Sequence, residues 1–159
     1  MTHLNCSGRG KGHVIFNKPE FGHIADNNEK DINITMIESE GFDVIAIYRS
    51  KEGSMGKLKQ KLESIINMSK SVLIVGDMNI CNKKMPTNEL RKYLEDKTFK
   101  QVINRATHID GGHLNHVYIM NEGNFVESPG IELIPKYYSD HDSICIAWRK
   151  LELTGGEHS

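Results

Sequence analysis

Apolar residues along this chain fall mostly in short alternating or continuous runs, which is the pattern of β-strands rather than of long helices. The run Val72-Leu73-Ile74-Val75 is apolar at every position, and this is typical of a central strand that is covered on both faces. The pattern predicts a strand-rich α/β sandwich rather than a regular alternation of strands and helices. The predicted strands cover residues 13–17, 32–38, 43–49, 72–75, 114–120, roughly 125–133, and 143–148.

Two segments have the spacing of amphipathic helices. The first has Ser54 as a candidate N-cap, and its apolar positions fall on one face: Met55, Leu58, Leu62, Ile65 and Ile66. The second is expected to open at Pro86-Thr87, with an acidic residue in its first turn and an apolar face: Glu89, Leu90, Tyr93 and Leu94.

The length of 159 residues fits one domain, which we place at residues 13–150. Glycine-rich composition predicts a flexible N-terminal segment over 1–12 and a flexible tail over 151–159. The formal charge of −1 excludes a histone-like polycation, so any binding of nucleic acid must come from a local patch.

Two further features of the sequence indicate where in the cell the protein is found. The apolar runs are too short for a membrane-spanning helix, so we expect no membrane association. The cysteines, Cys6, Cys81 and Cys145, form neither an even set nor a CxxC pair, which disfavours a disulfide framework and a cysteine zinc site. An intracellular location, cytoplasmic or nuclear, is the simplest interpretation.

Two polar clusters adjoin predicted strands. Asp77 and Asn79 directly follow the buried strand, and a carboxylate with an amide suits a divalent cation or a phosphate, although both residues also favour an ordinary Asx turn. Asp140 and His141 precede the last strand, where a histidine beside an aspartate can serve as a proton donor or acceptor next to a metal. The alternative there is a plain polar loop.

Two more clusters have competing interpretations. His108, His113 and His116 invite a zinc site, but positions 113 and 116 would point to opposite faces of a strand, which disfavours it. Tyr48 and Arg49 end another apolar strand and could contact phosphate, although a tyrosine there is commonly part of the packing.

The joint pattern is more specific than any single cluster. Its motifs occur in the order Tyr48, Gly76-Asp77-Met78-Asn79, Thr107, Leu114-Asn115-His116-Val117 and Ser139-Asp140-His141. This order resembles the endonuclease/exonuclease/phosphatase superfamily, whose fold is DNase I-like. The nearest resemblance is to the version of that domain in invertebrate proteins labelled PIF1-like helicases, and it covers roughly Gly10 to Lys150.

The resemblance implies a role for each matching residue. Asp77 would orient or deprotonate the attacking water, and Asn79 would hold the scissile phosphate and the metal shell. Asp140, with Asp77, would bind Mg²⁺ or Mn²⁺, and His141 would donate to the phosphate in the transition state. Asn115 would orient His141. The remaining predicted substrate contacts are Tyr48, Arg49, Thr107 (which would also brace the site), Lys83 and Lys84.

Two departures from the superfamily pattern weaken the expected activity. Members begin with a further block of sheet that carries an asparagine and a metal-binding glutamate, whereas the segment before Gly10 offers only Asn5, so we expect an N-terminally truncated domain that holds its metal weakly. Asn115 stands where the motif has aspartate, and a comparable change in a Ser-His-Asp triad costs about 10⁴ in rate. The missing strands would expose a sheet edge, which we expect a second copy of the chain or a partner to cover.

Three hypotheses follow. The favoured one is an enzyme, a divalent-metal-dependent phosphodiester hydrolase that acts on nucleic acid or another phosphodiester. The second is a non-catalytic or weakened module that binds nucleic acid, nucleotides or a protein. The third is an assembly module without a ligand, which is disfavoured because four candidate site residues occur together.

Overall fold

The computed structural model describes residues 2–8, 11–16, 22–81, 84, 87–120, 130–135 and 139–147. Strands dominate this part of the chain. In chain order the elements are β1 (Thr2–Gly8), β2 (Lys11–Phe16), β3 (His23–Asp26), β4 (Ile32–Glu38), β5 (Phe42–Arg49), α1 (Met55–Ile65), β6 (Ser71–Asp77), α2 (Glu89–Asp96), β7 (Lys100–Gln101), β8 (Asn115–Met120), β9 (Gly130–Ile134) and β10 (Ser143–Ala147).

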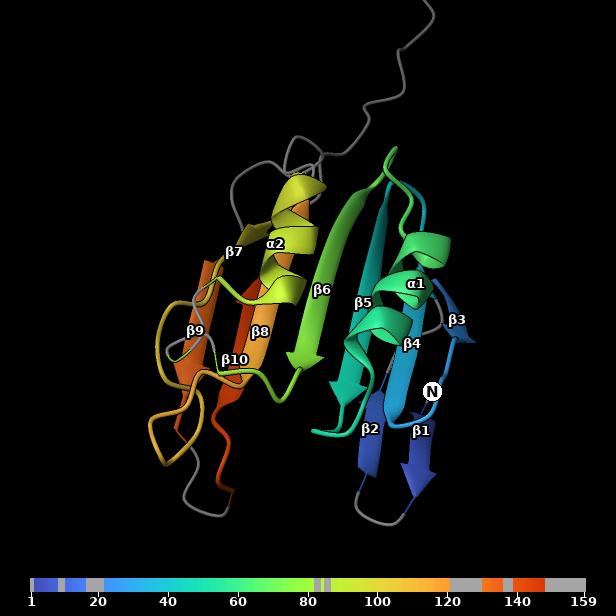
Figure 1. Ribbon diagram of the computed structural model, residues 1–159. Coiled ribbons are helices and arrows are strands. Elements are labelled where there is room, and N and C mark those ends of the chain that lie inside the picture. Colours follow the sequence, from blue (N-terminus) through green and yellow to red (C-terminus); the bar gives the residue numbers. More distant parts are fainter. Residues whose placement is uncertain are drawn as a thin grey trace, which may run out of the picture.

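The centre of the molecule is a six-stranded mixed sheet with the strand order β3-β4-β5-β6-β8-β7 (Figure 1). Strands β5 and β6 pair in parallel, and α1 connects them because a parallel pair needs a long crossover. The other pairs of this sheet are antiparallel. The ends of β5 and β6 therefore lie together at one edge of the sheet.

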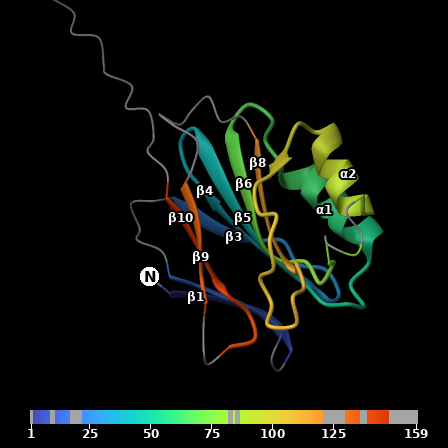
Figure 2. The same ribbon diagram turned by 90° about the vertical axis from the view of Figure 1, so that its left-hand side faces the viewer.

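A layer of different structure covers each face of this sheet (Figure 2). Helices α1 and α2 lie on one face, where Leu58 and Leu94 pack against Ile45 and Ile74 in the larger core. The hairpins β1–β2 and β9–β10 lie on the other face. There Leu73 of β6 belongs to a second core that includes residues of β8, β9 and β10. The prediction that the 72–75 strand is covered on both faces is confirmed.

Local capping sets where the helices begin. Ser54 caps α1, as predicted, and its hydroxyl accepts a hydrogen bond from the Lys57 amide at 3.3 Å. Helix α2 begins later than predicted, because Asn88 is its N-cap and accepts from the Arg91 amide at 2.9 Å. Pro86, which was expected to open it, lies outside the described residues.

Several strands differ from the sequence-based expectation. Residues 1–12 were expected to be a flexible segment, but Thr2–Gly8 and Lys11–Phe16 form an antiparallel hairpin, with a register irregularity between Cys6 and Gly8. Strands β3 and β7 were not predicted either. Both are short edge strands, whose pairing depends on a neighbour rather than on a long apolar run. The predicted tail over 151–159, residues 125–129 and Trp148 lie outside the described residues.

None of the helices in the part of the chain that the structure describes is long and apolar enough to cross a membrane.

Candidate active site

The register of the central sheet places three predicted site residues in one row. Tyr48 of β5 pairs with Asp77 of β6, and Asp77 pairs with Asn115 of β8. Asn33 of β4, which is fully buried and was not predicted, pairs with Tyr48 and extends the row. Because residues paired across strands share a face, all four belong to the face that the two hairpins cover.

The turn after β6 is built from Gly76, Asp77 and Asn79. Gly76 has φ of 148°, and a Cβ there would lie 1.8 Å from the carbonyl oxygen of Ile47, so only glycine fits. Asp77 Oδ1 accepts a hydrogen bond from the Asn79 amide at 3.0 Å. Asn79 has φ of 49°, a left-handed conformation that asparagine tolerates. The Asx turn that the sequence allowed as an alternative is therefore present. The same turn places the side chains of Asp77 and Asn79 at this edge of the sheet.

Arg49 braces this turn. Its Nη1 donates to the Met78 carbonyl at 3.0 Å, and its own carbonyl accepts from Asn79 Nδ2 at 2.7 Å. Burial lowers the pKa of the guanidinium, and the nearby Glu52 carboxylate opposes that effect. Arg49 was predicted to contact substrate, but these bonds give it a positioning contact with the turn.

Thr107 joins two loops at the same edge of the sheet. It is fully buried, its Oγ1 accepts from the Asn115 amide at 3.1 Å, and its carbonyl accepts from the Asp142 amide at 2.9 Å. The Ile109 amide donates to the Asp140 carbonyl at 2.8 Å. These bonds hold the segment with Asp140 against the row on the sheet, which agrees with the bracing role that we expect for Thr107.

His141 connects the row to the last loop. Its Nδ1 lies 3.1 Å from Asn115 Oδ1, and its Nε2 lies 3.9 Å from Asp77 Oδ2. Because an amide oxygen only accepts, Nδ1 carries the proton in this pair. Asn115 thus occupies the position expected of the residue that orients His141.

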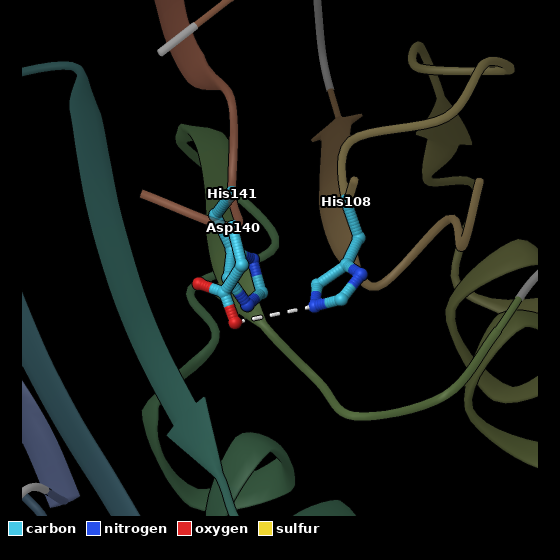
Figure 3. A group of neighbouring side chains, drawn as sticks. All are labelled: His108, Asp140 and His141. Carbon is cyan, nitrogen blue, oxygen red and sulfur yellow. Dashed lines mark ion pairs between the residues drawn. The ribbon is translucent and has the colours of Figure 1, made fainter. Parts of the chain in front are cut away.

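His108 was not predicted to belong to this site. Its Nε2 lies 3.4 Å from Asp140 Oδ2, and its ring stands perpendicular to that of His141 with the centroids 4.8 Å apart. One ligand atom from each of His108, Asp140 and His141 lies within 4.8 Å of the others (Figure 3). In the sequence, His108 stands out from the neighbouring histidines only by its position directly after Thr107.

His116 lies on the opposite face of β8 and is part of the core. Its Nδ1 is 3.0 Å from the Tyr118 hydroxyl and its Nε2 is 2.8 Å from the Ile80 carbonyl. Burial lowers its pKa to about 4, so the ring is neutral. The ring therefore lies on the helix side of the sheet, away from His108 and Asp140.

Charge at the site favours a cation. Burial raises the pKa of Asp77, and the negative charge of Asp140 raises it further, whereas the Asn79 amide and the two imidazoles His141 and His108 lower it. A bound cation would stabilise the charged form of the buried Asp77 carboxylate, which burial disfavours. The carboxylate oxygens of Asp77 and Asp140 and the Asn79 amide are the donors that Mg²⁺ and Mn²⁺ accept, so the residues present fit such an ion.

Of the two lysines predicted to contact the substrate, the structure describes only Lys84. Lys84 is exposed in the loop after Asn79, and its amide donates to the Cys81 carbonyl at 3.1 Å. Lys83 lies outside the described residues.

The comparisons with known proteins identify the fold. No family model matches this chain, and no curated protein matches it. Among solved structures, it is similar to the endonuclease domain of TRAS1, a telomere-specific non-LTR retrotransposon, with a TM-score of 0.65 and 9% sequence identity. The similarity covers 94% of this chain and 79% of that one. The chain therefore has an α/β DNase I-like fold, as the sequence predicted.

Proposed function

We propose that the protein is a divalent-metal-dependent phosphodiester hydrolase of the nuclease type. One observation carries this proposal: Asp77, Asn79, Asn115, Asp140 and His141 come from three separate segments and meet at one edge of the central sheet. The DNase I-like fold supports it, because the structural neighbour is itself an endonuclease domain. We also propose that the chain is related to the DNase I-like domain of invertebrate proteins labelled PIF1-like helicases.

The side chains divide the chemistry between them. Asp77 accepts a proton from the attacking water or orients it. His141 donates to the phosphate oxygen on which charge builds, and Asn115 holds the ring in the orientation that this requires. Asn79 and Tyr48 contact the phosphate. A Mg²⁺ or Mn²⁺ ion bound at Asp140 and Asp77 would neutralise the phosphate oxygens.

A nucleic acid is the substrate that we favour. The Asp140 side chain is 65% exposed, so the site is open to a phosphate in a long chain. Lys84, exposed in the loop after Asn79, is placed to attract a polyanion while the protein as a whole carries a formal charge of −1. We expect Lys83 to add to this local patch. Cys81 and Cys145 are free thiols, which fits the intracellular location that we propose.

A second function is favoured by Asn115. Its neutral oxygen lies 3.1 Å from His141 Nδ1 and supplies no negative charge to stabilise an imidazolium. A site weakened in this way would serve a module that binds nucleic acid or nucleotides without cleaving them.

A cleavage assay distinguishes the two functions. Purified protein is incubated with single- and double-stranded DNA and RNA in Mg²⁺ or Mn²⁺, beside Asp77→Ala and the control Asp96→Ala. Asp96 is an exposed residue at the end of α2. We expect cleavage by the wild type and the control, and a loss of at least about 100-fold in Asp77→Ala because its general base is gone. Binding of nucleic acid without cleavage in either metal would instead favour the module.

The layer formed by the hairpins supports a proposal about assembly. In the described residues, β1–β2 and β9–β10 are separate two-stranded sheets, so each hairpin presents strand edges that could pair with another chain. We propose that a second copy or a partner completes this layer. Sedimentation of the purified chain tests this: a dimer supports self-association, whereas a well-folded monomer at high concentration contradicts it.

A further inference from the structure

We propose that His108, Asp140 and His141 form a binding site for a transition-metal ion of the zinc class, with His108 as a ligand. The inference rests on the proposed function only in placing this ion at the same edge of the sheet. It assigns a role to His108. With a zinc-class ion bound, His141 Nε2 is a ligand, so binding of this ion and donation from His141 to the phosphate exclude each other.

The spacing of the donor atoms fits such an ion. His108 Nε2 and Asp140 Oδ2 are 3.4 Å apart. Two ligands at about 2.1 Å from a tetrahedral ion lie about 3.4 Å from each other. All three ligand atoms lie within 4.8 Å, so only a small movement is needed. The Asp140 side chain is 65% exposed and free to make it, whereas the two imidazoles are only 16% and 28% exposed.

Each imidazole has an oxygen atom near its second nitrogen. His141 donates from Nδ1 to Asn115 Oδ1 at 3.1 Å, which leaves Nε2 directed toward the site. His108 Nδ1 lies 3.2 Å from the Asp110 amide and 3.5 Å from the Asp110 carboxylate. Histidines that bind metals usually donate their other ring proton to an oxygen atom, as His141 does here to Asn115 Oδ1.

His108 can change tautomer when the ion binds. While Nδ1 accepts from the Asp110 amide, the ring proton is on Nε2 and faces Asp140. A metal ion on Nε2 requires that proton to move to Nδ1, where the Asp110 carboxylate can accept it. No net proton is released; Nδ1 then donates to the Asp110 carboxylate, and the Asp110 amide gives up its hydrogen bond to the ring.

The donor set determines which ion is preferred. Two imidazoles and one carboxylate suit Zn²⁺ and Co²⁺, whereas Mg²⁺ prefers oxygen ligands and retains water. Three protein ligands leave a coordination position open to water or to a phosphate oxygen. An ion here would thus lie beside Asp77, whose carboxylate is 3.9 Å from His141 Nε2.

Cobalt absorption spectroscopy tests the proposal without relying on activity. Metal-stripped protein is titrated with Co²⁺, whose visible bands report nitrogen and oxygen ligands, and then with Zn²⁺ as a competitor. We expect one Co²⁺ per chain, displaced by Zn²⁺, and an affinity at least about tenfold lower in His108→Ala, since even loss of an outer partner costs that much. His23→Ala, at an exposed histidine on β3, should bind as the wild type does.

The outcomes separate this inference from the proposed function. Unchanged Co²⁺ affinity in His108→Ala, or no Co²⁺ binding by the wild type, overturns the metal site whatever the nuclease assay shows. Absence of cleavage by the wild type in every metal rejects the hydrolase but leaves the site. Asp140→Asn serves as a second variant, because its exposed side chain can be changed without unfolding the protein, and it should also weaken Co²⁺ binding.

Discussion

Acid should destabilise this protein through His116, the histidine buried on the helix face of β8. The ring is fully buried between the Tyr118 hydroxyl at 3.0 Å and the Ile80 carbonyl at 2.8 Å. Because the carbonyl can only accept, Nε2 donates to it and Nδ1 accepts from the hydroxyl. The neutral ring therefore satisfies both partners, and protonation would turn Nδ1 into a donor and place a charge in the core.

The size of the effect follows from the shift in pKa. Burial lowers the pKa of His116 from 6.5 to about 4 in the folded protein. Between these values the unfolded chain binds a proton that the folded chain does not, so the free energy of unfolding falls as the pH falls. At about 1.4 kcal/mol per pKa unit, His116 removes about 2 kcal/mol of stability by pH 5 and about 3 kcal/mol by pH 4.

Urea unfolding at pH 7 and pH 5 measures this loss in the wild type and in His116→Gln. Other groups that titrate in this range, such as Asp77, contribute to both proteins, so the difference between their pH dependences isolates His116. If both proteins lose the same stability between the two pH values, His116 is not the source of the acid sensitivity. An NMR titration of the wild type gives a second check, because the His116 ring signal should not titrate above pH 5.

Three further predictions address the site and its support. Asn115→Asp should place a negative charge beside His141 Nδ1 and increase the rate of phosphodiester cleavage at least tenfold, measured by single-turnover kinetics; an unchanged rate would mean that Asn115 is not the partner of the catalytic histidine. Gly76→Ala should cost more than about 3 kcal/mol or prevent folding, measured by thermal unfolding, because its Cβ would meet a backbone oxygen at 1.8 Å. Lys70→Met should cost about 3 kcal/mol in urea unfolding, since it removes the partner, at 2.9 Å, of the buried Asp43 carboxylate; no loss of stability would show that this carboxylate is satisfied without Lys70.

The apolar pattern of each segment and the short sequence motifs were sufficient to predict the central strands and the candidate residues on them. The segment 32–38 was predicted with the bounds that the structure shows, because apolar and polar residues alternate from Ile32 to Met36, as in a strand with one buried face. Asp77 and Asn115 were predicted from motifs, and the pairing of β6 with β8 brings them together. Edge strands such as β3 lacked a signal of their own, since their stability comes from a neighbouring strand.

The role of His108 could not be predicted in this way. Its contact with Asp140 depends on two loops that meet through backbone bonds, including the pairing of residue 108 with residue 141. No periodicity in the sequence encodes a contact between loops. The sequence offered three histidines close together, and only the fold shows that one faces the site while His116 faces the core.

The register of β8 against β6 explains how the turn after β6 is held from both sides of the sheet. Asn115 points to the hairpin face and holds His141 beside Asp77, whereas the next residue, His116, points to the helix face and holds the Ile80 carbonyl. A slip of one residue in this pairing would exchange the two side chains between the faces. The imidazole of His116 would then enter the row, and the amide of Asn115 would face the core. Both contacts would be lost together, so the position of Asp77 depends on the register of the sheet as much as on its own loop.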